Sequence, residues 1–186
     1  MTDRHGRRRF LFVCTANICR SPTAELLARR RFGEDELLFR SAGFLQIDGG
    51  CPAELVDVLQ GRQIDATAHQ SYLLDETSIN AADLLLTMEG SHVQKATMLA
   101  PDAFAKIVPL KEAAAVLSDW SDGGGSATDP VTVERFIERL NTDRDPRQYL
   151  GTRWDVADPY GGRPKQYRAA VDEIEQLVYS VVGRLR

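Results

Sequence analysis

Cysteine is scarce in this chain, with only three among its 186 residues. A low and odd number of cysteines disfavours a secreted domain held by disulfides and favours a reducing compartment. The sequence therefore predicts a cytoplasmic protein.

Long hydrophobic runs are also lacking. The apolar segment 10–13 is far shorter than the ~18 residues of a membrane-spanning helix, and no hydrophobic signal region follows the arginines that precede it. We therefore expect no membrane partner.

No excess of positive charge is present, because the formal net charge is −4. Nothing global points to nucleic acid, and we expect no nucleic-acid partner. A basic cluster near the N-terminus favours a solvated tail before the first strand over a nucleic-acid arm. Its members are Arg4, Arg7, Arg8 and Arg9.

Short apolar segments alternate with helical patterns through the first part of the chain. Such alternation is typical of an α/β fold, here a four-stranded parallel sheet flanked by helices on both faces. Ligands of such sheets bind beyond the carboxyl ends of the strands, which is where Cys14 falls. The expected strands are 10–13, 37–42, 81–88 and 104–110, and the expected helices are 24–32, 53–59 and 91–99.

The pattern changes after residue 110. We expect helices at 112–120 and 131–140, a flexible break at 122–126, a loop at 141–151 and a closing helix at 164–186. No internal repeat or domain boundary is evident. The length suits one domain, 1–186, with 111–153 as a helical insertion within it.

One continuous segment carries the strongest chemical signal. Residues 14–22 read Cys-Thr-Ala-Asn-Ile-Cys-Arg-Ser-Pro, directly after the first expected strand. Ser21 is a favourable N-cap and can also hydrogen-bond the Cys14 sulfur, and Pro22 suits the first helical position. Backbone N–H groups at a helix N-terminus favour a bound anion. A buried cysteine after a strand is more often inert core, but the whole run favours Cys14 as a thiolate nucleophile beside Arg20.

Nucleophilic attack on a phosphate ester also requires a general acid for the leaving oxygen. Asp155 and Asp158 both lie upstream of the closing helix. An Asp-Pro pair is also an ordinary turn signal, so spacing alone leaves the choice between them open.

The segment 14–22 resembles the signature loop of the low-molecular-weight protein tyrosine phosphatases. Asp158-Pro159-Tyr160-Gly161-Gly162 is similar to the acid loop of the same family. The resemblance implies a metal-independent phosphatase without a cofactor, which acts through a cysteinyl-phosphate on Cys14. It also implies Asp158 as the general acid and Tyr160 as an aromatic wall for the substrate ring. The phosphate would be bound by Arg20 and by the loop residues Thr15, Ala16, Asn17, Ile18 and Cys19.

Further residues match the family individually. Ser41-Ala42-Gly43 resembles the family's Ser-Ala-Gly, and His69 stands where the family has a histidine. In the family these residues, with Asn17 and Ser21, form a hydrogen-bond network that holds the asparagine in a strained conformation. A turn-forming Ser41 and a surface His69 are the alternatives from the residues alone.

Three departures from the family pattern bear on selectivity. Ala16 replaces a usual glycine, so the loop must avoid backbone conformations that only glycine tolerates. The loop 44–50 lacks an aromatic Trp or Tyr, for which Phe44 or Leu45 are the candidates to stand in. Residues 111–153 are longer than a minimal member needs.

Three other functions compete with phosphotyrosine hydrolysis. Arsenate reductases of this fold use further cysteines near the third strand, but 84–99 contains none, and Cys51 lies elsewhere. Cys19 is a candidate for a protective disulfide with Cys14. Protein-arginine phosphatases carry Thr where this chain has Ile18, and a branched apolar residue there favours an aromatic phosphoester. A non-catalytic phosphate-binding protein would need neither a thiolate nor an acid. The sequence thus predicts a phosphotyrosine protein as substrate and leaves the oligomeric state open.

Overall fold

A four-stranded parallel sheet forms the centre of the computed structural model, which describes residues 6–120 and 131–185. The spatial order of the strands is β2-β1-β3-β4, and all pairs are parallel. The predicted α/β class and strand number are confirmed. The strands are β1 (Arg8–Cys14), β2 (Leu37–Gly43), β3 (Leu84–Thr87) and β4 (Ile107–Pro109).

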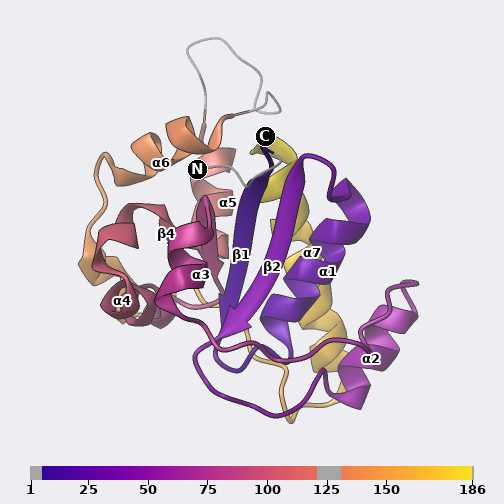
Figure 1. Ribbon diagram of the computed structural model, residues 1–186. Helices are drawn as coiled ribbons and strands as arrows, with labels where there is room; N and C mark the ends of the chain where they lie inside the picture. Colours follow the sequence, from indigo (N-terminus) through magenta and orange to yellow (C-terminus); the bar gives the residue numbers. More distant parts are fainter. Residues whose placement is uncertain (1–5, 121–130, 186) are drawn as a thin grey trace.

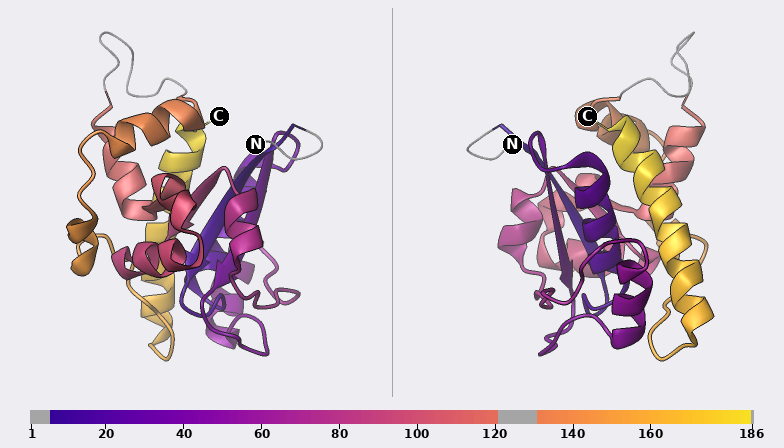
Figure 2. Two further views of the ribbon diagram at one scale, coloured as in Figure 1. Left: turned by 60° about the vertical axis from the view of Figure 1, so that its left-hand side comes forward. Right: turned by 90° about the vertical axis from the view of Figure 1, so that its right-hand side faces the viewer.

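Helices cover both faces of this sheet (Figures 1 and 2). On one face α1 packs against β1, β2 and α7, and α5 and α2 also contact α7; on the other, α4 contacts β3 and β4. The α-helices are α1 (Arg20–Phe32), α2 (Ala53–Gln60), α3 (Glu76–Ala81), α4 (Gly90–Leu99), α5 (Leu110–Ser118), α6 (Val133–Asn141) and α7 (Pro164–Arg184). Two 3₁₀ helices are η1 (Pro101–Lys106) and η2 (Pro146–Leu150).

Alternation along β1 explains why the sheet is buried on both sides. Phe10 and Phe12 enter the core on the α1–α7 side, whereas Leu11 and Val13 enter the core on the α4 side. Successive side chains of a strand point to opposite faces, so an uninterrupted apolar run requires cover on both. The run 10–13 was therefore sufficient to predict a central strand.

The two strands that follow β1 in the sequence lie on opposite sides of it in the sheet. β2 pairs with one edge of β1 and β3 with the other, which places a topological switch point at the carboxyl ends of β1 and β3. The arrowheads of β1 and β2 mark this end at the bottom of Figure 1. Ligands of open α/β sheets bind at such a point, and Cys14 ends β1 there.

Two predicted strands are shorter in the structure. The segment 81–88 begins later because helix α3, which the sequence did not predict, ends at Ala81. Asp75 caps α3, accepting the Ser78 backbone N–H at 2.7 Å, and the Ser78 hydroxyl bonds back to Asp75. The segment 104–110 begins as η1, which Pro101 starts, so β4 is confined to three residues.

Other local predictions also need correction. The expected loop 141–151 contains η2, and the closing helix ends at Arg184. Arg8 and Arg9 lie within β1 rather than in a solvated tail. In β1, Arg8 forms an ion pair with Glu134. Arg4 and the expected break 122–126 lie outside the described residues.

The helices of the segment 111–153 share the core of the sheet. Leu117 of α5 and Phe136 and Leu140 of α6 belong to the same buried cluster as Phe10. Val131 forms a parallel bridge with Leu185, next to the end of α7. Whether this segment is an insertion relative to smaller relatives stays a prediction.

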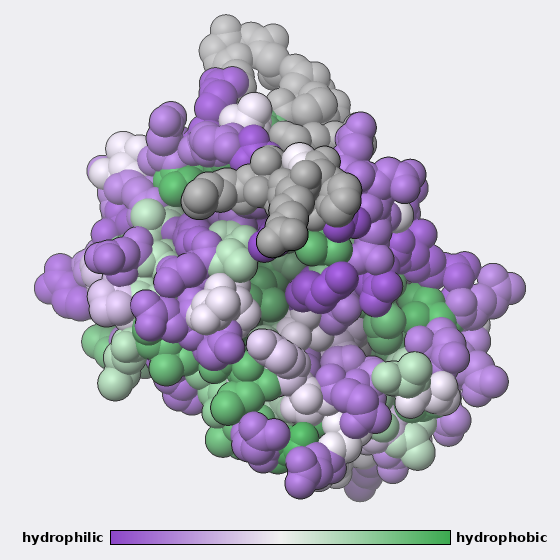
Figure 3. Space-filling model, in the orientation of Figure 1, coloured by the Kyte–Doolittle hydropathy of each residue, from purple (hydrophilic) through white to green (hydrophobic). Residues whose placement is uncertain are grey.

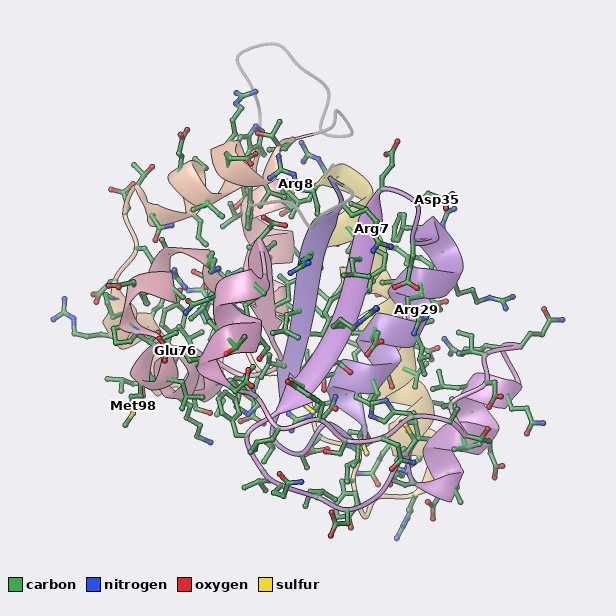
Figure 4. All side chains as sticks on the ribbon, viewed as in Figure 1. Arg7, Arg8, Arg29, Asp35, Glu76 and Met98 are labelled. Atoms are coloured by element: carbon green, nitrogen blue, oxygen red, sulfur yellow. The ribbon has the colours of Figure 1, made fainter. Side chains whose placement is uncertain are left out.

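The surface is mainly hydrophilic on the face drawn in Figure 3, with green patches toward its lower left. Met98 projects from the end of α4 and is 83% exposed (Figure 4). Within residues 6–120 and 131–185, no helix is both long and apolar enough to cross a membrane.

Candidate functional site

Cys14 is the last residue of β1, and its thiol is enclosed by the loop that follows. The residue is 3% exposed. Its Sγ lies 3.0 Å from Ser21 Oγ and accepts the Asn17 backbone N–H at 3.3 Å. The sulfur thus accepts one backbone N–H and also contacts a hydroxyl, and in that second contact either atom can donate the hydrogen.

Ser21 does not cap α1, contrary to the sequence prediction. The helix begins at Arg20, and its N-cap is Cys19, which makes no side-chain capping bond. Ser21 and Pro22 are therefore the second and third helical residues, where the missing proline N–H still costs no hydrogen bond. Because the Ser21 hydroxyl does not cap the helix, it lies within hydrogen-bond distance of Cys14 Sγ and of the Ala42 carbonyl.

Asn17 is held by contacts from several parts of the chain. Its φ is 53°, in the left-handed region that asparagine tolerates better than most residues. Its Nδ2 donates to Ser21 Oγ at 2.9 Å and to Ser41 Oγ at 2.8 Å. His69 Nε2 donates to the Asn17 carbonyl at 2.7 Å, and the Tyr72 N–H donates to Asn17 Oδ1 at 2.8 Å. The structure brings together the four residues that the family resemblance placed in one network.

Ala16 adopts no conformation reserved for glycine. Asn17 and Gln63 are the non-glycine residues with positive φ in the described chain, and Ala16 is not among them. The glycine that the loop does require is Gly43, because a Cβ there would lie 2.6 Å from the Asn17 nitrogen and 2.8 Å from the Ala16 carbonyl carbon. The end of β2 thus packs directly against the backbone of the loop.

Arg20 is buried and contacts two acidic side chains. The residue is 2% exposed. Nη2 donates to Asp158 Oδ2 at 2.7 Å and to Thr15 Oγ1 at 3.4 Å. Nη1 donates to Glu89 Oε1 at 2.6 Å and to the Val156 carbonyl at 3.1 Å. A bound phosphate would meet both Arg20 and the Asp158 carboxylate.

Asp158 and Asp155, left open by spacing, occupy different places. Asp158 contacts Arg20, and its Oδ1 also accepts the Tyr160 N–H at 3.2 Å. Asp155 Oδ1 instead accepts the Gly90 N–H at the start of α4, at 2.9 Å. Of the two carboxylates, the one that faces the guanidinium is therefore Asp158.

The residues expected to contact a substrate ring differ in their exposure to solvent. Tyr160 is 65% exposed and Leu45 is 49% exposed. Phe44 is half-buried, with its ring centroid 5.2 Å from that of His92. Of the two candidates in the loop 44–50, Leu45 is the more exposed, while Phe44 packs against α4.

Two residues of the site were missed by the sequence analysis, Glu89 and His92. Glu89 follows β3 and pairs with Arg20, and His92 Nε2 lies 3.2 Å from Thr15 Oγ1. The pKa of His92 is lowered to about 4, chiefly by burial and also by the positive charges of Arg20 and Lys95, which outweigh the opposing effect of Glu89. The signal that would have found them is position, because both follow the carboxyl end of a strand adjacent to β1.

The other two cysteines are also unpaired. Burial raises the pKa of the Cys19 thiol well above its usual range and that of Cys51 to about 12. Both thiols are therefore protonated at neutral pH. Across the described residues, no three His, Cys, Asp or Glu side chains gather closely enough to hold a metal ion.

Comparison with protein families places this geometry among known enzymes. The model of the family "Low molecular weight phosphotyrosine protein phosphatase" matches residues 9–121, which include the cysteine loop, Glu89 and His92. The chain belongs to this family. It is thus a phosphatase, a hydrolase by class.

Curated relatives of this phosphatase carry two different names. A "Protein-arginine-phosphatase" of Geobacillus stearothermophilus is 31% identical, with 96% of each chain covered. A "Low molecular weight protein-tyrosine-phosphatase PtpB" of Staphylococcus haemolyticus is 29% identical, over 96% of this chain and 97% of the relative. The relatives thus differ in the phosphorylated residue that their names specify.

Solved structures share the fold of this phosphatase. The "YwlE arginine phosphatase from Geobacillus stearothermophilus" matches with a TM-score of 0.68 at 28% identity, covering 93% of this chain and 89% of that chain. A low molecular weight protein tyrosine phosphatase from T. tengcongensis matches with a TM-score of 0.69 at 27% identity, covering 96% and 99%.

Proposed function

We propose that this phosphatase hydrolyses phosphotyrosine in proteins through a phosphate carried on Cys14. The observation that carries the proposal is the enclosure of Cys14 Sγ, 3.0 Å from Ser21 Oγ and in hydrogen-bond contact with the Asn17 N–H, within a loop that leads to Arg20. A thiolate so held is a nucleophile beside a cation that binds phosphate.

In the first step the Cys14 thiolate attacks phosphorus. The S–P bond forms as the bond to the phenolic oxygen breaks, and that oxygen takes the proton of Asp158. Arg20 and the loop amides of residues 15–19 hold the equatorial phosphoryl oxygens. Substrate binding separates Asp158 from Arg20, so that the carboxyl can turn toward the leaving oxygen.

In the second step water attacks the phosphorus of the cysteinyl-phosphate. Asp158 takes a proton from that water, the S–P bond breaks, and inorganic phosphate leaves. The Cys14 thiolate is now the leaving group, and the Ser21 hydroxyl donates a hydrogen bond to it. Splitting the hydrolysis in this way replaces one difficult step by two easier ones.

Selectivity for an aromatic ester is supported by the apolar lining of the site. Ile18 is half-buried and packs against the main core, and Tyr160 and Leu45 expose apolar surface beside the loop. We assign Tyr160 to the substrate ring. Three unpaired cysteines also favour a reducing compartment, and we place the enzyme in the cytoplasm.

A protein-arginine phosphatase is the second candidate, and one observation favours it. The relative of Geobacillus stearothermophilus with that name covers almost the whole chain at 31% identity. Against it stands Ile18, where the resemblance implies threonine in arginine phosphatases. An arsenate reductase is disfavoured because the described residues between β3 and the end of α4 contain no cysteine.

The test compares two peptides that differ only in the phosphorylated residue, phosphotyrosine or phosphoarginine, with a chelator present. We expect the phosphotyrosine peptide to have the higher kcat/KM with the wild type. Ile18→Thr should narrow or reverse the preference, while Val56→Thr on α2 serves as a matched control. A wild type that prefers phosphoarginine would move the assignment to the second candidate, and one that hydrolyses neither would contradict both.

A further inference from the structure

A buried histidine closes a ring of contacts around Arg20. His92 lies in the first turn of α4 and is 0% exposed. Its Nε2 lies 3.2 Å from Thr15 Oγ1 and 3.4 Å from Glu89 Oε2. Arg20 completes the ring, since Nη1 contacts Glu89 Oε1 and Nη2 contacts Thr15 Oγ1. Histidine therefore touches the loop that holds the nucleophile without touching Cys14.

The contacts define which nitrogen of His92 carries the hydrogen. The pKa of about 4 leaves the imidazole neutral near pH 7, with one N–H. His92 Nε2 lies beside the Glu89 carboxylate, and a lone pair on that nitrogen would face the negative oxygens, so a hydrogen on Nε2 is favoured. Nδ1 is buried without a hydrogen-bond partner, and a hydrogen placed there would be an unsatisfied donor. The hydrogen therefore resides on Nε2.

This tautomer determines what the Thr15 hydroxyl can do. Thr15 Oγ1 accepts one hydrogen bond from His92 Nε2 and another from Arg20 Nη2. Both lone pairs of the hydroxyl are then occupied, and among the described residues its own hydrogen has no acceptor. The hydrogen is left for a ligand that approaches Arg20 Nη2, the nitrogen that now contacts Asp158.

We propose that His92 is a positioning residue that orients the Thr15 hydroxyl to donate a hydrogen bond to a phosphoryl oxygen bound at Arg20. The inference rests on the proposed function for the presence of a phosphate in the loop. It adds a neutral donor to the charged Arg20 and the loop amides, on the Asp158 side of the phosphate. Since that donor needs only a neutral N–H at His92 Nε2, a side chain with an amide N–H at the same place should replace it.

The experiment is a double-mutant cycle read by the affinity for inorganic phosphate and by kcat/KM for an aryl phosphate. Thr15→Val removes the hydroxyl at nearly constant volume, and His92→Phe removes the Nε2 donor but keeps a ring. We expect each variant to weaken phosphate binding about 10-fold, as loss of one hydrogen bond to a charged group predicts. The double variant should lose no more than the larger single variant, because both changes remove the same bond.

Rescue separates positioning from packing. His92→Gln places an amide N–H near the position of Nε2 and should stay within about threefold of the wild type. Thr97→Val, on the same helix, is the control, since the Thr97 hydroxyl bonds only to the Val93 carbonyl among the described residues. Multiplicative losses in the double variant, or a His92→Gln variant as weak as His92→Phe, would overturn the inference.

Phosphate binding also separates this inference from the proposed function. If the wild type hydrolyses no phosphate ester but the Thr15→Val and His92→Phe cycle shows non-additive phosphate affinities, the proposed function is contradicted and the role of His92 is supported. Should His92→Phe not fold, ¹⁵N NMR of the wild-type imidazole decides the tautomer directly. A hydrogen on Nε2 that shifts in Thr15→Val supports the inference, and a hydrogen on Nδ1 overturns it.

Discussion

Asp158 Oδ2 lies 2.7 Å from Arg20 Nη2, so the candidate acid and the candidate phosphate-binding cation contact each other when no ligand separates them. Asp158 is 46% exposed at its side chain, whereas Arg20 is 3% exposed. The arginine is fixed by Glu89 and the Val156 carbonyl, and the aspartate is the partner that can move. Substrate therefore competes with Asp158 for one nitrogen.

Removing the acid should affect turnover more than binding. Asp158→Asn keeps the shape but cannot protonate the leaving oxygen, so we expect kcat for a phosphotyrosine peptide to fall about 10²- to 10³-fold. KM should change little or decrease, because the competing carboxylate charge is also gone. Steady-state kinetics measure both. Asp155→Asn is the matched control, and a larger loss there than in Asp158→Asn would transfer the acid role.

Ser21 should matter chiefly in the second step. Its hydroxyl lies 3.0 Å from Cys14 Sγ, and a hydrogen bond to a departing thiolate is worth about 1.5–3 kcal/mol. Ser21→Ala should lower kcat about 10-fold or more and produce a burst of released phenol as the phosphoenzyme accumulates. Ser180→Ala, on the exposed side of α7, is the control. A lower kcat without a burst would argue that Ser21 acts before the intermediate forms.

Replacing the Asn17 side-chain donor by an acceptor should destabilise the protein and lower its activity. Asn17 is 0% exposed, and its Nδ2 donates to Ser21 and Ser41. Asn17→Asp replaces that donor by a carboxylate oxygen and adds a negative charge beside the bound phosphate. We expect a loss of about 2–4 kcal/mol in the free energy of unfolding and at least 100-fold in kcat/KM. Urea denaturation measures the first, with the exposed Asn80→Asp as control. Equal stability of the two variants would mean that the network carries little energy.

His92 should make the fold sensitive to acid. Its pKa is about 4 in the folded chain against about 6.5 when unfolded, so the unfolded chain binds the proton more tightly. This contribution is complete above pH 6.5 and is lost as pH falls from 6.5 toward 4, with about 2 kcal/mol gone by pH 5. Between pH 7 and pH 5 the wild type should therefore lose about 2 kcal/mol more than His92→Gln. Parallel losses in urea denaturation of both proteins would contradict the buried neutral imidazole.

The parts of the site that could be predicted from the sequence are those encoded within one segment. The run from Phe10 to Pro22 contains a strand, a loop and a helix start, and each is recognisable from neighbouring residues. The alternating burial of β1 follows directly from that apolar run.

The parts that could not be predicted depend on which strands become neighbours. Glu89 and His92 reach Arg20 only because β3 pairs with β1, a pairing that local periodicity does not specify. Residue spacing alone left the choice between Asp155 and Asp158 open, and only the family resemblance implied Asp158, because which carboxylate reaches Arg20 depends on how the chain folds back over the site. Ser21 was assigned both a capping role and a contact with the Cys14 sulfur; the helix begins at Arg20, two residues before the predicted start at Pro22, so the contact alone is formed.

The central claim is that Cys14 carries the phosphate, and rapid quenching tests it most directly. Asp158→Asn, mixed with an excess of p-nitrophenyl phosphate and quenched in acid within its first turnovers, should contain a single phosphate on Cys14, detected by mass spectrometry and by the ³¹P signal of an S–P bond. Cys14→Ala should contain none and hydrolyse nothing. A phosphate on any other residue, or hydrolysis that persists in Cys14→Ala, would contradict the account.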